Sequence, residues 1–200
     1  MDGTLVNSEP LKGKALAQAC LAYDAEVDYH IYQEVMGEDW PTVTQHFFNK
    51  AKIAPEINTF NHAFRSHYQK LLQSELELTL GARSYLSQLK QEGCQLGVVS
   101  SAANWMLKQI LTQLELDAFF DIIICQEDVS QHKPHPEAYL VALEKLGVKA
   151  KDTLVFEDSH AGVCAAKEAG CDVVAIKHKF NGSNTLDGAL KSICCFSEMR

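Results

Sequence analysis

Four short stretches of the sequence carry polar side chains that can bind a ligand, and three of them lie where predicted strands end. They contain Asp2 in DGTLV, Ser100 in VVSS, Lys133 in HKPHPEAY, and Glu157 and Asp158 in FEDSHAG. Parallel α/β sheets bind their ligands at the carboxyl ends of the strands. The carboxylates, the hydroxyl and the amine of these stretches are therefore candidates for a ligand site.

Each stretch also has a purely structural explanation. Asp2 lies in a turn-forming Asp-Gly pair, and a lysine before a proline is most often a solvated loop residue. Asp158 can cap the helix that begins near His160. Ser101 or Asn104 can cap the helix that follows VVSS. It is the four stretches together, in this order and at this spacing, that favour a functional site.

The elements that would position these residues alternate from residue 82 onward. ARSYLSQLKQEG, PEAYLVALEKLG and AGVCAAKEAG have helical features, and QLGVVS, DIIIC, TLVFED and CDVVAIK are short apolar runs typical of buried strands. Alternating strands and helices of this kind indicate a parallel sheet that is covered on both faces.

Residues 10–81 follow a different pattern, with helical periodicity and no buried strand. The sequences MGEDWP and KIAPE divide this segment into three or four helices. The segment is too long to be a loop within an α/β unit. We therefore predict an all-helical cap over residues 10–81, inserted into a core formed by residues 1–9 and 82–200.

Composition limits the partners of the chain. Hydrophobic residues make up 46% of the sequence, and the formal net charge of −8 argues against nucleic acid or an anionic membrane as the main partner. Without a long apolar span or a signal-peptide pattern, we expect a soluble cytoplasmic protein, either a monomer or a weak dimer. The seven cysteines are odd in number and form no CxxC pair, which favours reduced thiols.

The wording of the four stretches resembles a known family. DGTLVNSEP, HKPHPEAYLVALEKLGV and VFEDSHAGVCAAKEAG are similar to motifs of the haloacid dehalogenase-like superfamily, in its β-phosphoglucomutase-like branch of sugar-phosphate phosphatases and mutases. The resemblance covers nearly the whole chain. It implies a Rossmann-like α/β core with a parallel sheet and an inserted helical cap. The implied activity is Mg²⁺-dependent hydrolysis of small phosphorylated metabolites, above all sugar phosphates, through a phospho-aspartyl intermediate.

The resemblance also assigns roles to individual residues. The Asp2 side chain would be the general acid and base, which protonates the departing hydroxyl and then activates water. Ser100 and Lys133 would bind the phosphoryl group. Glu157, Asp158 and the backbone carbonyl of Asp2 would be the oxygen ligands of Mg²⁺.

The opening of the sequence raises a question about the nucleophile. The family's first motif is Asp-x-Asp-Gly-Thr, its nucleophile is the first aspartate, and Met1 stands at x. We therefore expect the nucleophile immediately before Met1, at the end of an apolar strand that lies centrally in the sheet. A chain that starts at Met1 is expected to turn over little substrate and to fold poorly. The alternative is a non-catalytic binding or regulatory protein.

Residues of the cap favour a phosphatase over a phosphomutase, which is the other alternative. Mutases of the branch often carry an arginine where this chain has Trp40, which can stack on a ligand but cannot clamp phosphate. Trp40 can equally be a cap-core aromatic. Lys12 stands near the usual mutase histidine. Arg65 is a candidate to supply the missing charge, and Ser101 and Asn104 are further candidates for substrate contact.

Overall fold

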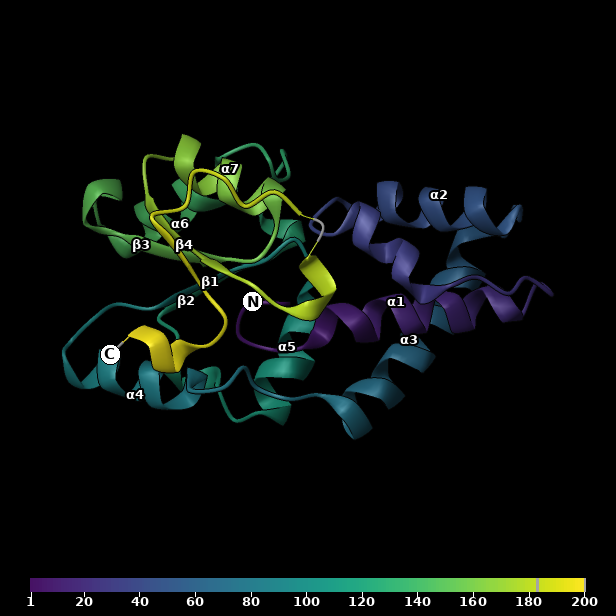
Figure 1. The fold of residues 1–200 in the computed structure, drawn as a ribbon, viewed down its shortest axis with the longest axis horizontal. Helices are drawn as coiled ribbons and strands as arrows, with labels where there is room; N and C mark the ends of the chain where they lie inside the picture. Colours follow the sequence, from purple (N-terminus) through teal and green to yellow (C-terminus); the bar gives the residue numbers. More distant parts are fainter. Residues whose placement is uncertain (183, 200) are drawn as a thin grey trace.

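An α/β core and a layer of cap helices make up the computed structural model, which describes residues 1–182 and 184–199 (Figure 1). Helices and strands alternate along the core, which confirms the α/β class expected from the sequence. Their bounds are α4 Ala82–Gln91, β1 Gly97–Val99, α5 Asn104–Gln113, β2 Ile122–Ile124, α6 Glu137–Leu146, β3 Leu154–Glu157, α7 His160–Glu168, β4 Asp172–Ile176 and β5 Lys191–Ile193.

The core strands are parallel and pair in two groups, β1 with β2 and β3–β4–β5 in that order. Val98 lies opposite Ile123 in the first group, and Val155 lies opposite Val173 in the second. Helix α6 packs on the first pair and α7 on β3 and β4. The apolar runs predict every strand except β5, in which only one of three residues is buried.

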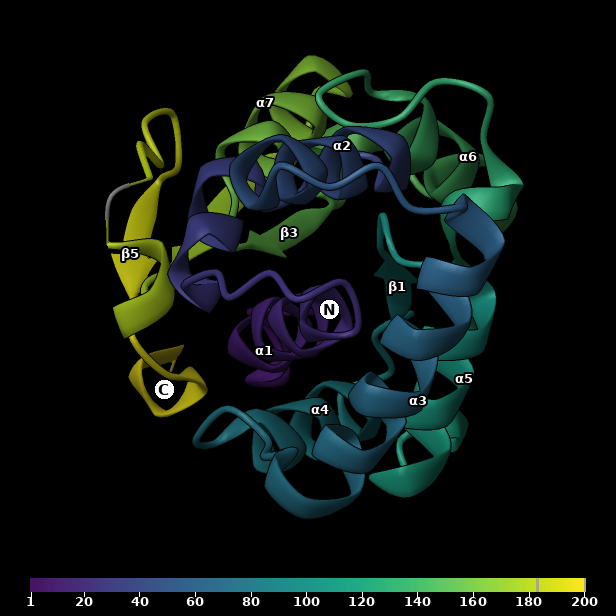
Figure 2. The same cartoon turned by 90° about the vertical axis from the view of Figure 1, so that its right-hand side faces the viewer.

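An apolar cavity of about 410 Å³ lies between the two groups of strands. Residues 97–99 of β1 and residues 154–156 of β3 line it, together with Leu86, Leu143 and Phe196. Figure 2 shows β1 and β3 apart, with α1 and the N-terminus below β3 and to the left of β1 in this view. The expectation of a further central strand is not tested by these contacts and stays a prediction.

The cap contains helices only, as the periodicity predicts. It comprises α1 Ser8–Leu21, the 3₁₀-helix η1 Tyr29–Val35, α2 Trp40–Ala51 and α3 Ile57–Glu75. The buried residues of α3 recur every fourth position and form one face of the helix, which packs against α1. They are Phe60, Phe64, Tyr68 and Leu72. Helix α1 begins two residues before the expected boundary at residue 10, and the division into domains stays a prediction.

Two short linkers join the cap to the core and hydrogen-bond to each other. The backbone N–H of Thr79 donates to the carbonyl of Leu5 at 2.8 Å, and the Thr79 hydroxyl donates to the carbonyl of Thr4 at 2.7 Å. The backbone N–H of Asn7 donates to the carbonyl of Glu77 at 3.1 Å. Because these bonds tie the linkers together, the turn that carries Asp2 has a fixed position relative to the cap.

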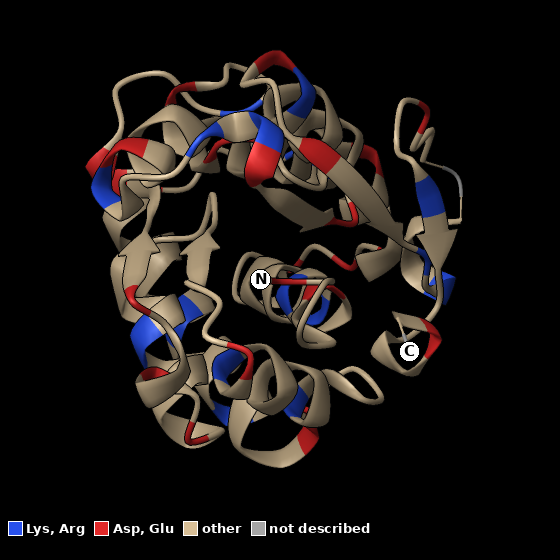
Figure 3. Cartoon of the chain, turned by 90° about the vertical axis from the view of Figure 1, so that its left-hand side faces the viewer, with Lys and Arg blue, Asp and Glu red and all other residues tan. Residues whose placement is uncertain are grey.

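Charged residues are dispersed over the fold. In the view of Figure 3, Lys and Arg are interspersed with Asp and Glu along the outer helices. Among the helices described, none combines the length and the apolar character that crossing a bilayer would require. The expectations of a cytoplasmic location and of a monomer or weak dimer stay predictions.

Candidate active site

A small cavity of about 60 Å³ between the core and the cap brings the sequence-predicted residues together. The core side of its wall contains Asp2, Ser100, Ser101, Lys133, Glu157 and Asp158, and the cap side contains Glu9, Lys12, Tyr32 and Trp40. Apart from Asp2, which lies in the N-terminal turn, the core residues come from strand ends and from the loops that follow them, which is where parallel sheets bind ligands. The four stretches therefore share one site, although they are far apart in the sequence.

The carboxylate of Asp2 is buried and held by three donors. The Ser8 hydroxyl donates to Oδ1 at 2.6 Å, the Ser100 hydroxyl donates to Oδ2 at 3.0 Å, and Lys12 Nζ lies 2.9 Å from Oδ1. Burial by itself would raise the pKa of Asp2, but the charges of Lys12 and of the N-terminal amine, together with the Ser8 hydrogen bond, lower it well below its usual value. Asp2 is therefore ionised and fixed in orientation.

Lys12 also pairs with Glu9, so one cation serves two buried carboxylates. Lys12 Nζ donates to Glu9 Oε1 at 3.0 Å. Although burial opposes the charged form, Asp2 and Glu9 raise the pKa of Lys12 well above its usual value. Burial raises the pKa of Glu9. Glu9 Oε2 is buried and has no hydrogen-bond partner in residues 1–182 and 184–199, which leaves one acceptor for a ligand at the cavity wall.

Lys133 belongs to a second buried group, which it forms with Glu157 and Tyr139. Lys133 Nζ and the Tyr139 hydroxyl both donate to Glu157 Oε1, and Lys133 Nζ lies 3.2 Å from the Tyr139 oxygen. Burial opposes ionisation of Glu157, but the Lys133 charge lowers the pKa of Glu157 below its usual value. Burial and the neighbouring Glu157 raise the pKa of Tyr139 well above its usual value. Lys133 is therefore a fixed positive charge.

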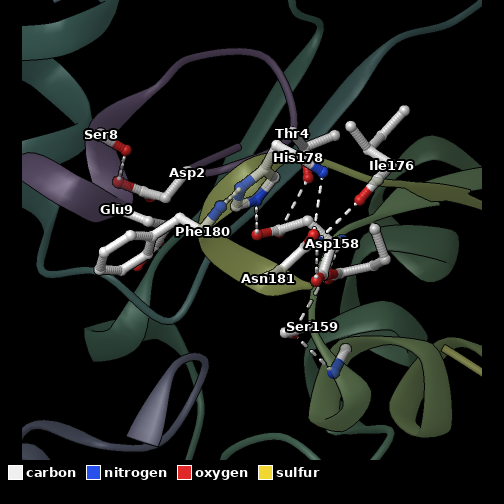
Figure 4. A network of polar contacts seen from close by, with 12 residues as sticks. Asp2, Thr4, Ser8, Glu9, Asp158, Ser159, Ile176, His178, Phe180 and Asn181 are labelled. Carbon is white, nitrogen blue, oxygen red and sulfur yellow. Dashed lines mark hydrogen bonds and ion pairs between the residues drawn. The ribbon is translucent and has the colours of Figure 1, made fainter. Parts of the chain in front are cut away.

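Asp158 has a different environment from Glu157, because no lysine is bonded to its carboxylate. The Thr4 hydroxyl donates to Oδ1 at 3.1 Å, and His178 Nε2 lies 3.2 Å from Oδ2 (Figure 4). In the part of the chain that the structure describes, no lysine or arginine lies within ion-pair distance of this carboxylate. Asp158 therefore has a charge that is not balanced by a permanent cation.

Two glycines allow the backbone to approach these carboxylates. Gly3 has a φ of +62°, and a Cβ there would lie 1.9 Å from Asp158 Oδ2. A Cβ on Gly162, in the first turn of α7, would lie 2.1 Å from the carboxyl carbon of Glu157.

The cap of α7 is Ser159, whose hydroxyl accepts from the backbone N–H of Gly162 at 3.1 Å. The structural explanation of Asp158 as a helix cap is therefore wrong.

The donor chemistry of Asp158 fits a divalent cation better than that of Glu157 does. The described residues contain no group of three or more His, Cys, Asp and Glu side chains with metal-binding spacing. Glu157 already accepts from Lys133 and Tyr139 on Oε1, and its Oε2 accepts from the backbone N–H of Asp158. Asp158 has a hard carboxylate, free of cationic partners, at the cavity wall. Asp158 and the Asp2 carbonyl would be the first ligands, and the role of Glu157 as a ligand stays a prediction.

Of the four candidates for substrate contact, two line the cavity and two do not. Ser101 and Trp40 line the cavity, whereas Asn104 and Arg65 are not among its lining residues. Trp40 Nε1 donates to Asn61 Oδ1 at 2.9 Å, and the Trp40 ring packs 4.6 Å from the ring of Phe64. The guanidinium of Arg65 lies 4.4 Å from the ring centroid of Trp105. Trp40 therefore both packs within the cap and lines the cavity.

Several residues of the site lie outside the sequence-predicted set. Thr4, Ser8 and Tyr139 belong to the stretches that drew attention, but nothing in their spacing distinguishes them from turn and packing residues. His178 follows β4 without any motif. Only their contacts with buried carboxylates identify them.

Comparison with known proteins agrees with this fold. Residues 1–176 match the family model of the haloacid dehalogenase-like hydrolases. A phosphorylated carbohydrates phosphatase of Thermotoga maritima is 27% identical over 187 residues, which cover 93% of this chain and 87% of that protein. A validoxylamine A 7'-phosphate phosphatase of Streptomyces hygroscopicus is 32% identical over 177 residues, covering 88% and 82%.

A solved structure extends the likeness to the fold. The β-phosphoglucomutase of Clostridium difficile is 20% identical, has a TM-score of 0.82 and matches 100% of this chain and 90% of its own. The chain belongs to the haloacid dehalogenase-like hydrolase family. The prediction of a phosphohydrolase of this family, with a Rossmann-like core and a helical cap, is confirmed.

Proposed function

We propose that this protein is a Mg²⁺-dependent phosphatase of small phosphorylated metabolites, with sugar phosphates as the preferred class. The observation that carries the proposal is the convergence of Asp2, Ser100 and Lys133 with Asp158 on one small cavity under the cap. These groups supply the proton-transfer carboxylate, the phosphoryl-binding donors and the carboxylate for a cation that phosphoryl transfer requires.

Asp2 is the general acid and base in this proposal. Its contacts with Ser8, Lys12 and Ser100 orient the carboxylate and keep it ionised, which suits it to accept a proton from an attacking water. When a substrate binds, Lys133 donates to the phosphoryl oxygens, and the Ser100 hydroxyl exchanges its bond to Asp2 for one to the phosphoryl group. A Mg²⁺ ion held by Asp158 would neutralise charge on the same oxygens.

The attacking group of the proposal is an aspartate that the family motif places immediately before Met1. The side chain of Asp2 is already held by three donors and is assigned to proton transfer. Asp2 takes up a proton as the substrate binds and gives it to the departing hydroxyl as the phosphoryl group passes to the preceding aspartate. Asp2 then accepts a proton from the water that hydrolyses this intermediate. Loss of that proton when phosphate leaves returns both carboxylates to their starting state.

The cap supports hydrolysis of sugar phosphates. The names of the phosphatase relatives include phosphorylated carbohydrates and a 7'-phosphate, and the unpartnered Glu9 Oε2 could accept a hydrogen bond from a substrate hydroxyl. Trp40 lines the cavity with an apolar ring whose N–H is bound to Asn61. Because Trp40 cannot hold a second phosphate, it favours a phosphatase over a phosphomutase.

The test compares three chains: residues 1–200, the same residues preceded by an apolar strand ending in Asp, and that extension ending in Asn. Phosphate release from glucose 6-phosphate and other sugar monophosphates is measured with Mg²⁺ and with a chelator. We expect turnover that needs both Asp and Mg²⁺ and is nearly abolished by Asn.

Each other outcome has a distinct meaning. Equal turnover by the unextended chain would overturn the assignment of the nucleophile. Isomerisation of a sugar phosphate that depends on a bisphosphate activator would favour the phosphomutase. A folded Asp-ending chain that releases phosphate from no sugar monophosphate would reject the proposed activity.

A further inference from the structure

The segment of residues 177–181, which follows β4, lies between the Asp158 carboxylate and the cap (Figure 4). It contains His178 and the 3₁₀-helix η5 Lys179–Asn181. Three of its side chains, those of His178, Phe180 and Asn181, contact either Asp158 or the cap. None of the motifs that define the proposed function includes these residues.

The hydrogen bonds of His178 define which ring nitrogen carries the proton. The backbone N–H of Phe180 points to His178 Nδ1 at 3.2 Å, and a backbone N–H can only donate. Nδ1 must therefore be the acceptor, which places the proton on Nε2. Nε2–H in turn donates to Asp158 Oδ2 at 3.2 Å. His178 is thus a neutral, oriented donor to the carboxylate.

Asn181 fixes the same segment to the backbone of Asp158. Its side-chain amide donates to the carbonyls of Asp158 at 2.8 Å and Ile176 at 2.9 Å, and its Oδ1 accepts from the backbone N–H of His178 at 2.9 Å. Asn181 is 2% exposed. Because its amide is buried and fully engaged, this side chain holds His178 and Asp158 in one rigid arrangement.

Phe180 connects this arrangement to the cap. Its ring is stacked with Tyr29 of η1, with centroids 6.0 Å apart and planes 4° apart. The ring of Tyr32, also from η1, lies 6.3 Å away. Tyr32 itself lines the cavity of the site. One short segment therefore contains both the residues that bond to Asp158, His178 and Asn181, and the residue that packs against the cap, Phe180.

We propose that His178 and Asn181 are positioning residues that orient Asp158 toward a divalent cation, and that Phe180 ties this orientation to the seated cap. The inference rests on the proposed function through the assignment of Asp158 as a metal ligand. With Thr4 on Oδ1 and His178 on Oδ2, each carboxylate oxygen keeps a lone pair for the ion. Donors of this kind raise metal affinity because they fix the ligand before the ion arrives.

The experiment measures Mg²⁺ binding directly by calorimetry, without substrate, in residues 1–200 preceded by the apolar strand ending in Asp. His178→Leu removes both ring nitrogens, and we expect it to weaken Mg²⁺ binding about 10- to 100-fold. His178→Gln keeps an amide donor and should recover part of that loss. The control is His62→Leu, because His62 is an exposed histidine of α3 outside the cavity. Thermal unfolding without Mg²⁺ checks that each variant is folded.

The cap contact is tested by Phe180→Ala. We expect a weaker Mg²⁺ affinity than in the parent, although the Phe180 side chain is apolar and donates no hydrogen bond to Asp158, and a smaller increase in melting temperature on adding Mg²⁺. If His178→Leu does not fold, the Gln and Phe180→Ala variants carry the test.

The results separate this inference from the function on which it rests. A parent chain that binds Mg²⁺ while the folded His178 and Phe180 variants stay within twofold of it would overturn the inference alone. A parent chain that binds no Mg²⁺ would overturn both the metal assignment of Asp158 and the inference.

Discussion

At the scale of residues, the site is governed by how each buried charge is paired. Glu157 is neutralised by Lys133, and Asp2 and Glu9 share Lys12, whereas Asp158 has only neutral donors. A buried charge is costly unless it is paired. Lys12 and Lys133 therefore offset the cost of burying the carboxylates that they pair with. Asp158 has no such partner, and a bound metal cation would balance its charge.

Replacement of Lys12 by methionine tests this pairing. The variant keeps the aliphatic volume but leaves Asp2 and Glu9 buried without a cation, so we expect a loss of about 3–5 kcal/mol in unfolding free energy at pH 7. The folded-state pKa of Asp2 lies below its usual value, so its stabilising contribution is present above the unfolded pKa and is lost as pH falls. The difference between the two chains should therefore shrink below about pH 4.

Lys14→Met is the matched control, two residues away on α1. Lys14 pairs with Glu75 at the surface, and such pairs contribute less than about 1 kcal/mol. Urea unfolding across pH measures both variants. Equal losses of unfolding free energy for Lys12→Met and Lys14→Met would mean that the buried ion pairs of Lys12 contribute no more to stability than the surface pair of Lys14.

At the scale of elements, the termini of the cap helices depend on side chains that the sequence places there. Helix α3 begins after Glu56, whose carboxylate accepts from the backbone N–H groups of Asn58 at 2.9 Å and Thr59 at 2.7 Å. These bonds satisfy donors that the first turn of a helix leaves free. They also lower the pKa of Glu56, with the bond from Asn58 as the largest cause.

Glu56→Ala is therefore expected to lower the melting temperature at pH 7. The contribution of an acid with a lowered folded-state pKa is present above its unfolded pKa and is lost as pH falls through the folded value. The parent and the variant should thus converge in acid. Thermal unfolding at several pH values measures this, with Glu26→Ala as a control at another exposed glutamate. A difference that did not change with pH would point to something other than the charged cap.

At the scale of the whole molecule, cap and core share their apolar interior. One cluster of buried side chains includes Leu16 of α1, Phe64 of α3, Leu107 of α5 and Ile176 of β4. The two linkers are also bound to each other. Apolar burial that is continuous across two parts couples their stability. We therefore expect the cap and the core to unfold together.

Tryptophan fluorescence can report on the two parts separately. Trp105→Phe leaves Trp40 in the cap, and Trp40→Phe leaves Trp105 in the core. Added to either background, Phe64→Ala should lower the unfolding free energy by about 3–5 kcal/mol. Both reporters should shift by the same amount. Leu80→Ala, at a side chain that is 72% exposed, should change little. Two separate transitions, with only the cap reporter moved by Phe64→Ala, would refute the coupling.

The sequence by itself determined the class of fold and most of the elements. Apolar runs such as TLVFED and the helical pattern around Phe60 and Phe64 depend on neighbours close along the chain, so they can be recognised without the fold. Strand β5 was missed because a three-residue strand with one buried position has no periodicity to recognise. Asp2, Ser100, Lys133 and Asp158 could be proposed together because ends of parallel strands meet at one edge of a sheet.

Only the tertiary structure decided which partner each of these residues has. Ser100 reaches Asp2 across 98 positions, and Thr4 reaches Asp158 across 154. Such contacts follow from how the elements pack, and no local pattern encodes them. The same holds for the difference between Glu157 and Asp158, which are adjacent in the sequence. One faces Lys133 and the other faces His178, because alternate side chains at a strand end point in different directions.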